Sequence, residues 1–130
     1  MKDFAFRVGH RPGELAQVAA MLARYGVNIK SLAALAVDGR ATVHILPDEP
    51  EPARAALTKH GIPFEETTVV SVLLENRAGE LARVSRKLGE SGVNLQALYV
   101  TGLVDNLVEL AIVADDPEKA RQAIEQQERC

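Results

Sequence analysis

The chain has 130 residues, of which 47% are apolar and 25% are charged, and its formal net charge is -3. This length by itself suggests one domain, with no room for a separate catalytic domain beside a regulatory one, and this composition is that of a globular protein rather than a disordered one. Lysines and arginines are spread along both halves instead of following one stripe, so we predict no nucleic-acid partner.

Two further features of composition bear on the compartment and on metal chemistry. No segment approaches the roughly 18 consecutive apolar residues that a membrane-spanning helix needs, and Met1-Lys2-Asp3 leads directly into a strand-like segment rather than a signal peptide. We therefore expect a cytoplasmic protein with no membrane partner. The only cysteine is Cys130, which we interpret as an incidental exposed thiol. We predict no intrachain disulfide, no metal site and no cofactor.

The sequence contains an internal repeat. Residues 11–32 realign on residues 77–98 at a spacing of 66, and eleven of these 22 positions are identical. A second block, residues 48–57, matches residues 115–124 with the spacing longer by one, and we expect the extra residue to lie in a turn. Two domains, 1–67 and 68–130, therefore replace the single domain that length suggests. Units this small bury little surface alone, so the halves should support each other.

Each copy is predicted to begin with a strand and an amphipathic helix. Apolar residues first alternate with other residues, which is the period of a half-buried strand: Phe4, Phe6 and Val8, then Val70, Val72 and Leu74. They next recur at intervals of three and four, which forms one stripe on a helix: Leu15, Val18 and Leu22, then Leu81, Val84 and Leu88. Gly26 and Gly92 are expected to end these helices, because glycine readily adopts a positive φ.

The rest of each copy is predicted to be a hairpin and a second helix. In the first copy the second strand runs from Asn28 to Val37, turns at Asp38-Gly39, a strong two-residue hairpin signal, and returns over 41–46. The second copy is expected to turn less tightly, near residues 102–106. Pro50 and Pro117 suit the first turn of a helix, and residues 63–67 supply a short fourth strand to the first copy.

This order of strand, helix, strand, strand, helix, strand predicts an α+β fold of the ferredoxin-like βαββαβ plan, with helices on one face of a mainly antiparallel sheet. The second copy lacks a full last strand, because only three residues follow a helix ending near Gln127. Its open edge invites pairing. The second strands, 30–37 and 96–100, are apolar on both faces, so we expect the halves to pair and the chains to form a homodimer.

A motif shared by both copies resembles the ACT domain family, the amino-acid-sensing modules attached to phosphoglycerate dehydrogenase, aspartate kinase and similar enzymes. The motif is Asn-Arg-x-Gly-x-Leu before the helix and Gly-Val-Asn-Ile/Leu after it, at 76–81 and 92–95 and, with one departure, at 10–15 and 26–29. The resemblance covers nearly the whole chain. It implies a non-catalytic pair of ACT domains that binds a small molecule, an amino acid by family analogy, between the loop of one ACT unit and the strand of its neighbour.

The chemistry of the motif supports this expectation. A helix N-terminus carries unpaired N–H groups and a partial positive charge, and Gly13 or Gly79 would let a carboxylate approach it closely. The side chain of Asn28 or Asn94 offers a donor and an acceptor for the ammonium and carboxylate groups of an amino acid. The predicted ligand-binding residues are Asn76, Gly79, Leu81 and Asn94 in the second copy and His10, Gly13, Leu15 and Asn28 in the first.

Simpler explanations exist for several of these residues. His10 replaces the asparagine of the motif, and it is either an exposed loop histidine or a donor to a carboxylate whose charge makes binding depend on pH. Turns and helix ends alone account for the repeated glycines and for the asparagines that precede strands. His44 and His60 show no metal-ligand spacing, so we interpret both as solvated surface residues.

Two other functions compete with the amino-acid sensor. One is a protein-interaction module that docks on a metabolic enzyme or regulator and binds no metabolite. The other is an acylphosphatase-type enzyme, which shares the ferredoxin-like plan and would use Arg11 with Asn28. The phosphate-cradling loop of such enzymes is missing before the first helix, so we predict no catalytic residue.

Overall fold

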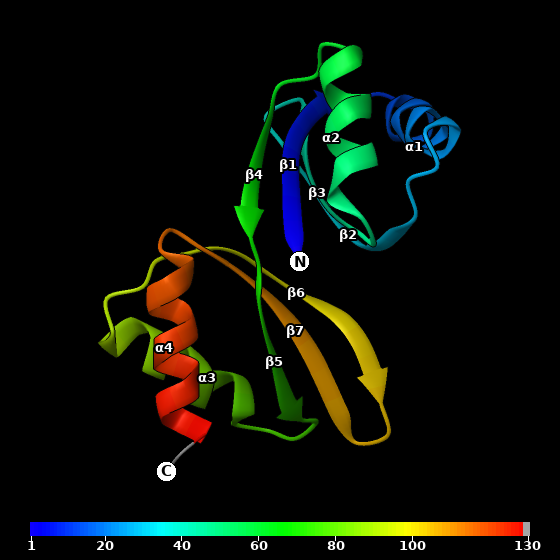
Figure 1. The fold of residues 1–130 in the computed structure, drawn as a ribbon. Helices are drawn as coiled ribbons and strands as arrows, with labels where there is room; N and C mark the ends of the chain where they lie inside the picture. The colour runs from blue at the N-terminus through cyan, green and yellow to red at the C-terminus, as the bar shows by residue number, and fades with distance from the viewer. Residues whose placement is uncertain (129–130) are drawn as a thin grey trace. The chain divides into compact units, whose positions relative to one another are not determined.

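The computed structural model describes residues 1–128, which form two compact units: unit 1, Met1–Thr67, and unit 2, from Thr68 onward (Figure 1). Each is an α+β unit that contains the predicted order of strand, helix, strand, strand and helix. No described helix is long and apolar enough to cross a membrane.

Unit 1 has the complete ferredoxin-like plan. Its sheet has the strand order β2-β3-β1-β4, in which β3 pairs antiparallel with both β1 and β2. The elements are β1 (Lys2–Gly9), α1 (Glu14–Arg24), β2 (Ile29–Val37), β3 (Arg40–Pro47), α2 (Pro50–Lys59) and β4 (Phe64–Thr68).

Unit 2 repeats this plan without the last strand. Its sheet has the order β5-β7-β6, and α4 continues to Glu128, so no strand follows α4 within residues 1–128 and the predicted open edge is confirmed. Cys130 lies outside the described residues. The elements are β5 (Val70–Glu75), α3 (Glu80–Glu90), β6 (Leu95–Val104), β7 (Leu107–Ala114) and α4 (Pro117–Glu128).

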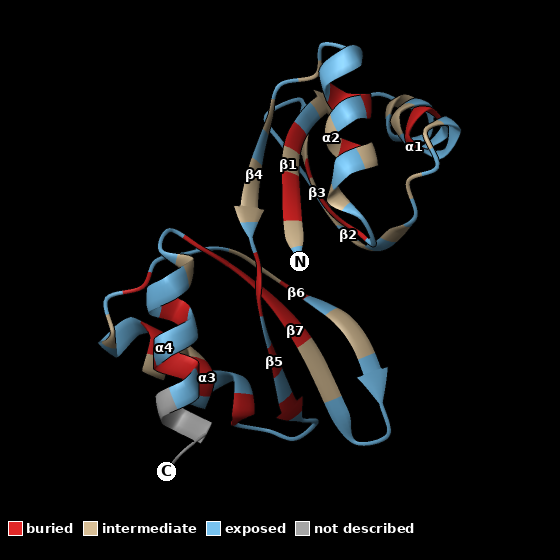
Figure 2. Ribbon diagram, viewed as in Figure 1, coloured by how far each residue is buried: buried red, intermediate tan, exposed pale blue. Residues whose placement is uncertain are grey.

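The core of each unit lies between its two helices and one face of its sheet. In unit 1, Phe4 and Ile45 from the strands pack with Leu22 of α1 and Leu57 of α2. Unit 2 builds the corresponding core on β5, β7, α3 and α4. Figure 2 shows the buried residues concentrated on these central strands and inner helix faces, while much of β2 and the outer part of β6 is exposed.

Both hairpins turn tightly, so the expectation of a looser turn in unit 2 was wrong. Asp38-Gly39 joins β2 to β3 and Asp105-Asn106 joins β6 to β7, with φ of 53° at Asp38 and 52° at Asp105. The extra residue of the second copy does not lie in a turn. It lies within β6, where Val100 faces Leu110 and Gly102 faces Glu109, so Thr101 forms a bulge.

Candidate functional site

The loop between the first strand and the first helix has the same backbone in both units. Gly13 and Gly79 stand at the N-caps of α1 and α3 in the left-handed conformation, with φ of 85° and 92°. No side chain of the described residues caps either helix there. The Glu14 and Glu80 N–H groups donate to the Arg11 and Arg77 carbonyls at 3.2 and 3.5 Å. The N–H groups of the next helical residues lie at an end with a partial positive charge, a geometry that suits a carboxylate.

The left-handed backbone at Gly79 leads to a prediction for its replacement by alanine. Gly79→Ala should lower the free energy of unfolding by about 1–2 kcal/mol, because a Cβ disfavours the left-handed conformation, although no atom lies within 4 Å to oppose it. The matched control is Gly89→Ala in the last turn of α3, where a Cβ also meets nothing within 4 Å and should stabilise by up to about 0.5–1 kcal/mol. Urea denaturation of both variants measures the pair. Equal changes would contradict the strained backbone at Gly79.

The sequence pattern placed Leu15 and Leu81 in the buried stripe of each helix, and this prediction was wrong. They are 39% and 51% exposed, beside the helix N-termini. In α3 the inward position is taken by Glu80, which is 8% exposed and whose Oε2 accepts a hydrogen bond from Arg83 Nε at 2.7 Å. This hydrogen bond lowers the pKa of Glu80. Because successive helical residues point about 100° apart, an inward Glu80 turns Leu81 toward solvent.

The residue that opens each loop is tied to the neighbouring hairpin. The His10 N–H donates to the Gly39 carbonyl at 3.1 Å, and the Asn76 N–H donates to the Asn106 carbonyl at 2.8 Å. Both side chains are exposed. The predicted residues His10, Gly13 and Leu15, and likewise Asn76, Gly79 and Leu81, thus gather at the hairpin end of their own units.

The remaining predicted residues, Asn28 and Asn94, lie at the other end of their sheets. The register pairs Val37 with Arg40 at the hairpin and Ile29 with Pro47 at the far end, so the length of β2, roughly 30 Å, separates Asn28 from the hairpin. Asn94 similarly precedes β6, opposite the turn beside Asn76. Neither unit therefore brings its asparagine to its own glycine loop, and Asn76 does not meet Asn94.

Each of these asparagines has an aspartate partner that the sequence analysis missed. Asn28 Nδ2 donates to Asp48 Oδ2 at 2.5 Å, and the Asp48 N–H donates to the Asn28 carbonyl at 3.0 Å. The N–H of Asn94 donates to Asp115 Oδ1 at 3.1 Å, and its Nδ2 lies 3.4 Å from Oδ2. The sequence did contain a signal for these partners. Both aspartates begin the second repeated block, so the asparagine–aspartate pair occurs in both copies.

The same separation bears on catalysis. Arg11 lies in the glycine loop, where its guanidinium is 2.9 Å from Glu14 Oε1, while Asn28 lies at the far end of unit 1. The two residues of an acylphosphatase-type site therefore do not meet within this unit. Among residues 1–128 no three His, Cys, Asp or Glu side chains are grouped to hold a metal ion.

His44 is not the solvated surface residue that its spacing suggested. Its side chain is 18% exposed, and Nδ1 lies 2.9 Å from Oδ2 of Asp3, a carboxylate with no exposed surface. The two residues come from adjacent strands, β3 and β1, which is why a linear pattern does not reveal them. His60 is on the surface as expected, with Nε2 3.4 Å from the Tyr25 hydroxyl.

Solved structures of other proteins share this fold. No protein-family model matches the chain, and no curated protein matches it. Protein BT0572 from Bacteroides thetaiotaomicron has the same fold with a TM-score of 0.84 at 21% identity, over 98% of this chain and 88% of that chain. The ligand-free regulatory subunit of aspartate kinase from Thermus thermophilus matches with a TM-score of 0.64 at 18% identity, over 96% of this chain and 90% of that chain.

The chain has the tandem ACT-domain fold. A structure of aspartokinase alpha and beta subunits agrees, with a TM-score of 0.69 at 17% identity over 99% of this chain and 93% of that chain. At these identities the likeness establishes the fold, and the ligand must be argued from the residues of each ACT unit.

Proposed function

We propose that this tandem ACT protein is a non-catalytic regulatory module that binds a small molecule, and that the ligand is an amino acid. The observation that carries the proposal is the repeated glycine loop, with its left-handed N-cap and uncapped helix N-terminus. Such an end favours a carboxylate. The exposed Leu15 or Leu81 beside it offers apolar contact to the rest of the ligand.

The asparagine–aspartate pairs suit the other charge of an amino acid. Asp48 and Asp115 are exposed carboxylates held by Asn28 and Asn94, and a carboxylate beside an amide oxygen is a ready acceptor for an ammonium group. Because each pair lies at the far end of its sheet, one unit cannot supply both features to a single ligand, and we propose that a second copy of the chain supplies the other. We therefore propose a cytoplasmic homodimer, and a monomeric mass from solution scattering would contradict it.

The regulated partner is proposed to be a metabolic enzyme or regulator. One structure with the same fold is named as the regulatory subunit of aspartate kinase. A regulatory role needs a second site or protein whose state the ligand changes. A partner protein would supply that second site.

Thermal unfolding against a panel of the standard amino acids tests ligand binding. A ligand at about 100 times its dissociation constant should stabilise the folded state by roughly 2.7 kcal/mol, which raises Tm by several degrees. We expect one amino acid, or a few related ones, to produce this rise, and we expect Asn94→Ala to reduce it. A flat panel would contradict the sensor.

The companion variant is Asp115→Ala, which removes the carboxylate proposed to accept the ammonium group and leaves the Asn94 amide in place. It should reduce the ligand-induced rise in Tm as Asn94→Ala does. The informative quantity is the ligand-induced rise in Tm rather than the Tm of the free protein. If the two variants keep the same rise as the wild type, the pair at the start of β6 does not contact the ligand.

A second candidate is the protein-interaction module, and one feature of unit 2 favours it. The β6–β7 hairpin presents a run of exposed apolar side chains: Val100, Leu103, Val104 and Leu107, which are 50%, 71%, 63% and 38% exposed. Exposed apolar side chains gathered in one hairpin are typical of an interaction site. A partner retained in a pull-down regardless of amino acids would favour docking, whereas capture or release on adding one amino acid would favour sensing.

A further inference from the structure

Unit 1 contains a hollow of about 410 Å³ at the hairpin end of its sheet. Four side chains that carry or can carry positive charge line it: Arg7 of β1, Arg40 of β3, and His10 and Arg11 of the glycine loop. We call it the arginine hollow. Its volume lies within the range of roughly 300–1,000 Å³ that is usual for small-molecule sites.

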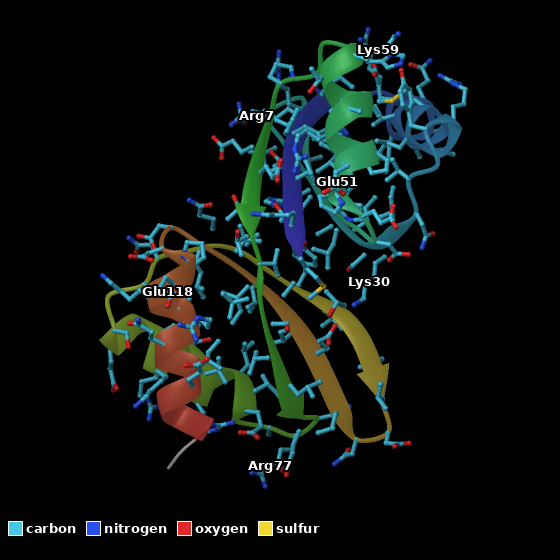
Figure 3. The ribbon with its side chains drawn as sticks, in the orientation of Figure 1. Arg7, Lys30, Glu51, Lys59, Arg77 and Glu118 are labelled. Carbon is cyan, nitrogen blue, oxygen red and sulfur yellow. The ribbon has the colours of Figure 1, made fainter. Side chains whose placement is uncertain are left out.

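The strand register places Arg7 and Arg40 on one face of the sheet. Arg7 pairs with Thr42 and Gly9 pairs with Arg40, so the two arginines are diagonal neighbours on adjacent strands, whose Cβ atoms are typically roughly 7–8 Å apart. Phe4, Phe6 and Val8 occupy the opposite, helix-covered face of β1. Figure 3 shows Arg7 on the side of β1 away from α1. Two long side chains at this spacing can contact one anion together.

The hollow carries more positive than negative charge. Among the side chains that the structure describes, residues 1–125, no carboxylate lies within 4.0 Å of the Arg7 or Arg40 guanidinium, and Arg11 is paired with Glu14 at 2.9 Å. Three arginines therefore face a single carboxylate. By contrast, the guanidinium group of Arg54 is paired with Glu66 at 2.7 Å. Like charges gathered without partners repel one another, and a bound anion removes that repulsion.

The matching corner of unit 2 has a different chemistry. The repeat aligns Arg7 with Leu73, Arg40 with Leu107 and Gly9 with Glu75. Glu75 there neutralises Arg77, which Figure 3 labels in the loop before α3, with Oε2 3.0 Å from Nε. The fold of an ACT unit therefore does not require arginines at this corner, and their presence in unit 1 needs another explanation.

The shape of the hollow is set by backbone contacts. The His10 N–H donates to the Gly39 carbonyl at 3.1 Å, which fixes the glycine loop against the β2–β3 turn. A Cβ on Gly9 would lie 3.3 Å from Glu14 Oε1 and 3.5 Å from the Arg11 guanidinium, so glycine leaves room for the Arg11–Glu14 pair over the strand end. A site held in this way needs little rearrangement to bind.

We propose that the arginine hollow binds a small oxyanion with at least two negative charges, either a phosphate compound or a polycarboxylate. Arginine forks pair with both groups through two parallel hydrogen bonds. The cluster is confined to one corner of a chain with a net charge of -3, which fits a small anion rather than the many phosphate contacts of a nucleic acid. The hollow shares His10 with the amino-acid site proposed for unit 1 and adds Arg7 and Arg40, which take no part in that site.

The experiment is an amide-resolved NMR titration of the full chain with inorganic pyrophosphate and, separately, with citrate, each against sodium chloride at matched ionic strength. We expect saturable shifts at residues 9–11 and 39–40 with at least one of the two anions. The variant is Arg7→Gln with Arg40→Gln, and it should weaken that binding about tenfold or more. The matched control is Arg24→Gln with Arg86→Gln, which removes the same charge from α1 and α3 and should leave affinity unchanged.

Each outcome decides the proposal. Saturation by pyrophosphate assigns a phosphate compound, and saturation by citrate assigns a polycarboxylate. No saturable shift with either anion, or equal weakening in the control variant, overturns the site. The Arg7→Gln, Arg40→Gln variant should keep its full Tm response to an amino acid, so failure of this site and failure of the amino-acid site are distinguishable.

Discussion

Replacing Phe4 with alanine is expected to lower the free energy of unfolding of unit 1 by about 3–5 kcal/mol. Phe4 has no exposed surface, and its ring centroid lies 5.5 Å from that of Phe64 of β4. Truncation removes the buried ring and leaves a cavity between the sheet and the helices, because the surrounding core relaxes only in part. Urea denaturation followed by circular dichroism measures the loss.

Two substitutions set the scale for this result. Val70→Ala changes the corresponding position in unit 2, where the side chain is smaller and 9% exposed, so its cost should be lower. Leu35→Ala on β2, where the side chain is 68% exposed, should change stability by no more than about 0.5 kcal/mol. A loss for Phe4→Ala as small as that for Leu35→Ala would show that Phe4 is not at the centre of the core.

The features that the sequence predicts well are those set by local chemistry. Asp38-Gly39 supplies the two positive φ angles of a tight hairpin, and Gly26 and Gly92, with φ of 75° and 76°, follow the ends of α1 and α3. Because the helix-ending glycine occurs in both copies, the two copies support the same prediction. The repeat therefore predicts the order of elements that the two units share.

The predictions that were wrong concern positions that a sequence pattern cannot distinguish from their neighbours. An extra residue gives the same spacing whether it lies in a turn or in a strand, so the bulge at Thr101 could not be located. Helical periodicity also leaves open which of two adjacent residues faces inward. In α3 Glu80 is the buried one of the two, where it pairs with Arg83 and lies 3.8 Å from Arg77, whereas Leu81 is exposed.

The sequence predicted the glycine loops of the candidate site but not the aspartates that pair with its asparagines. Local signals identify Gly13 and Gly79 as helix starts, and the structure places them there. The asparagines' distance from the loops follows from strand register, which links residues far apart in sequence. The arginine hollow has the same cause, because Arg7 and Arg40 become neighbours only when β1 pairs with β3.

The pair formed by Asp3 and His44 should make stability depend on pH. The hydrogen bond from His44 Nδ1 to Asp3 raises the pKa of His44 above its usual value of 6.5, and this outweighs the opposing effect of burial. A raised pKa in the folded state means that the folded chain holds the proton more tightly than the unfolded chain. The stabilisation is fully present below about pH 6.5 and is lost as the pH rises through the higher folded-state pKa.

Replacing His44 with alanine is therefore expected to cost roughly 3 kcal/mol near pH 6, because the buried Asp3 carboxylate loses its imidazolium partner. The difference in the free energy of unfolding between wild type and variant should become smaller as the pH is raised. The wild-type imidazole then becomes neutral, whereas the variant has no imidazole at this position to deprotonate. Urea denaturation at several pH values measures this trend. His60→Ala is the matched control, because it removes an exposed histidine whose contact with Tyr25 is long, at 3.4 Å, and it should cost no more than about 0.5 kcal/mol. A constant difference between wild type and His44→Ala across the pH series would show that the pair contributes packing alone and that protonation of His44 is not linked to folding.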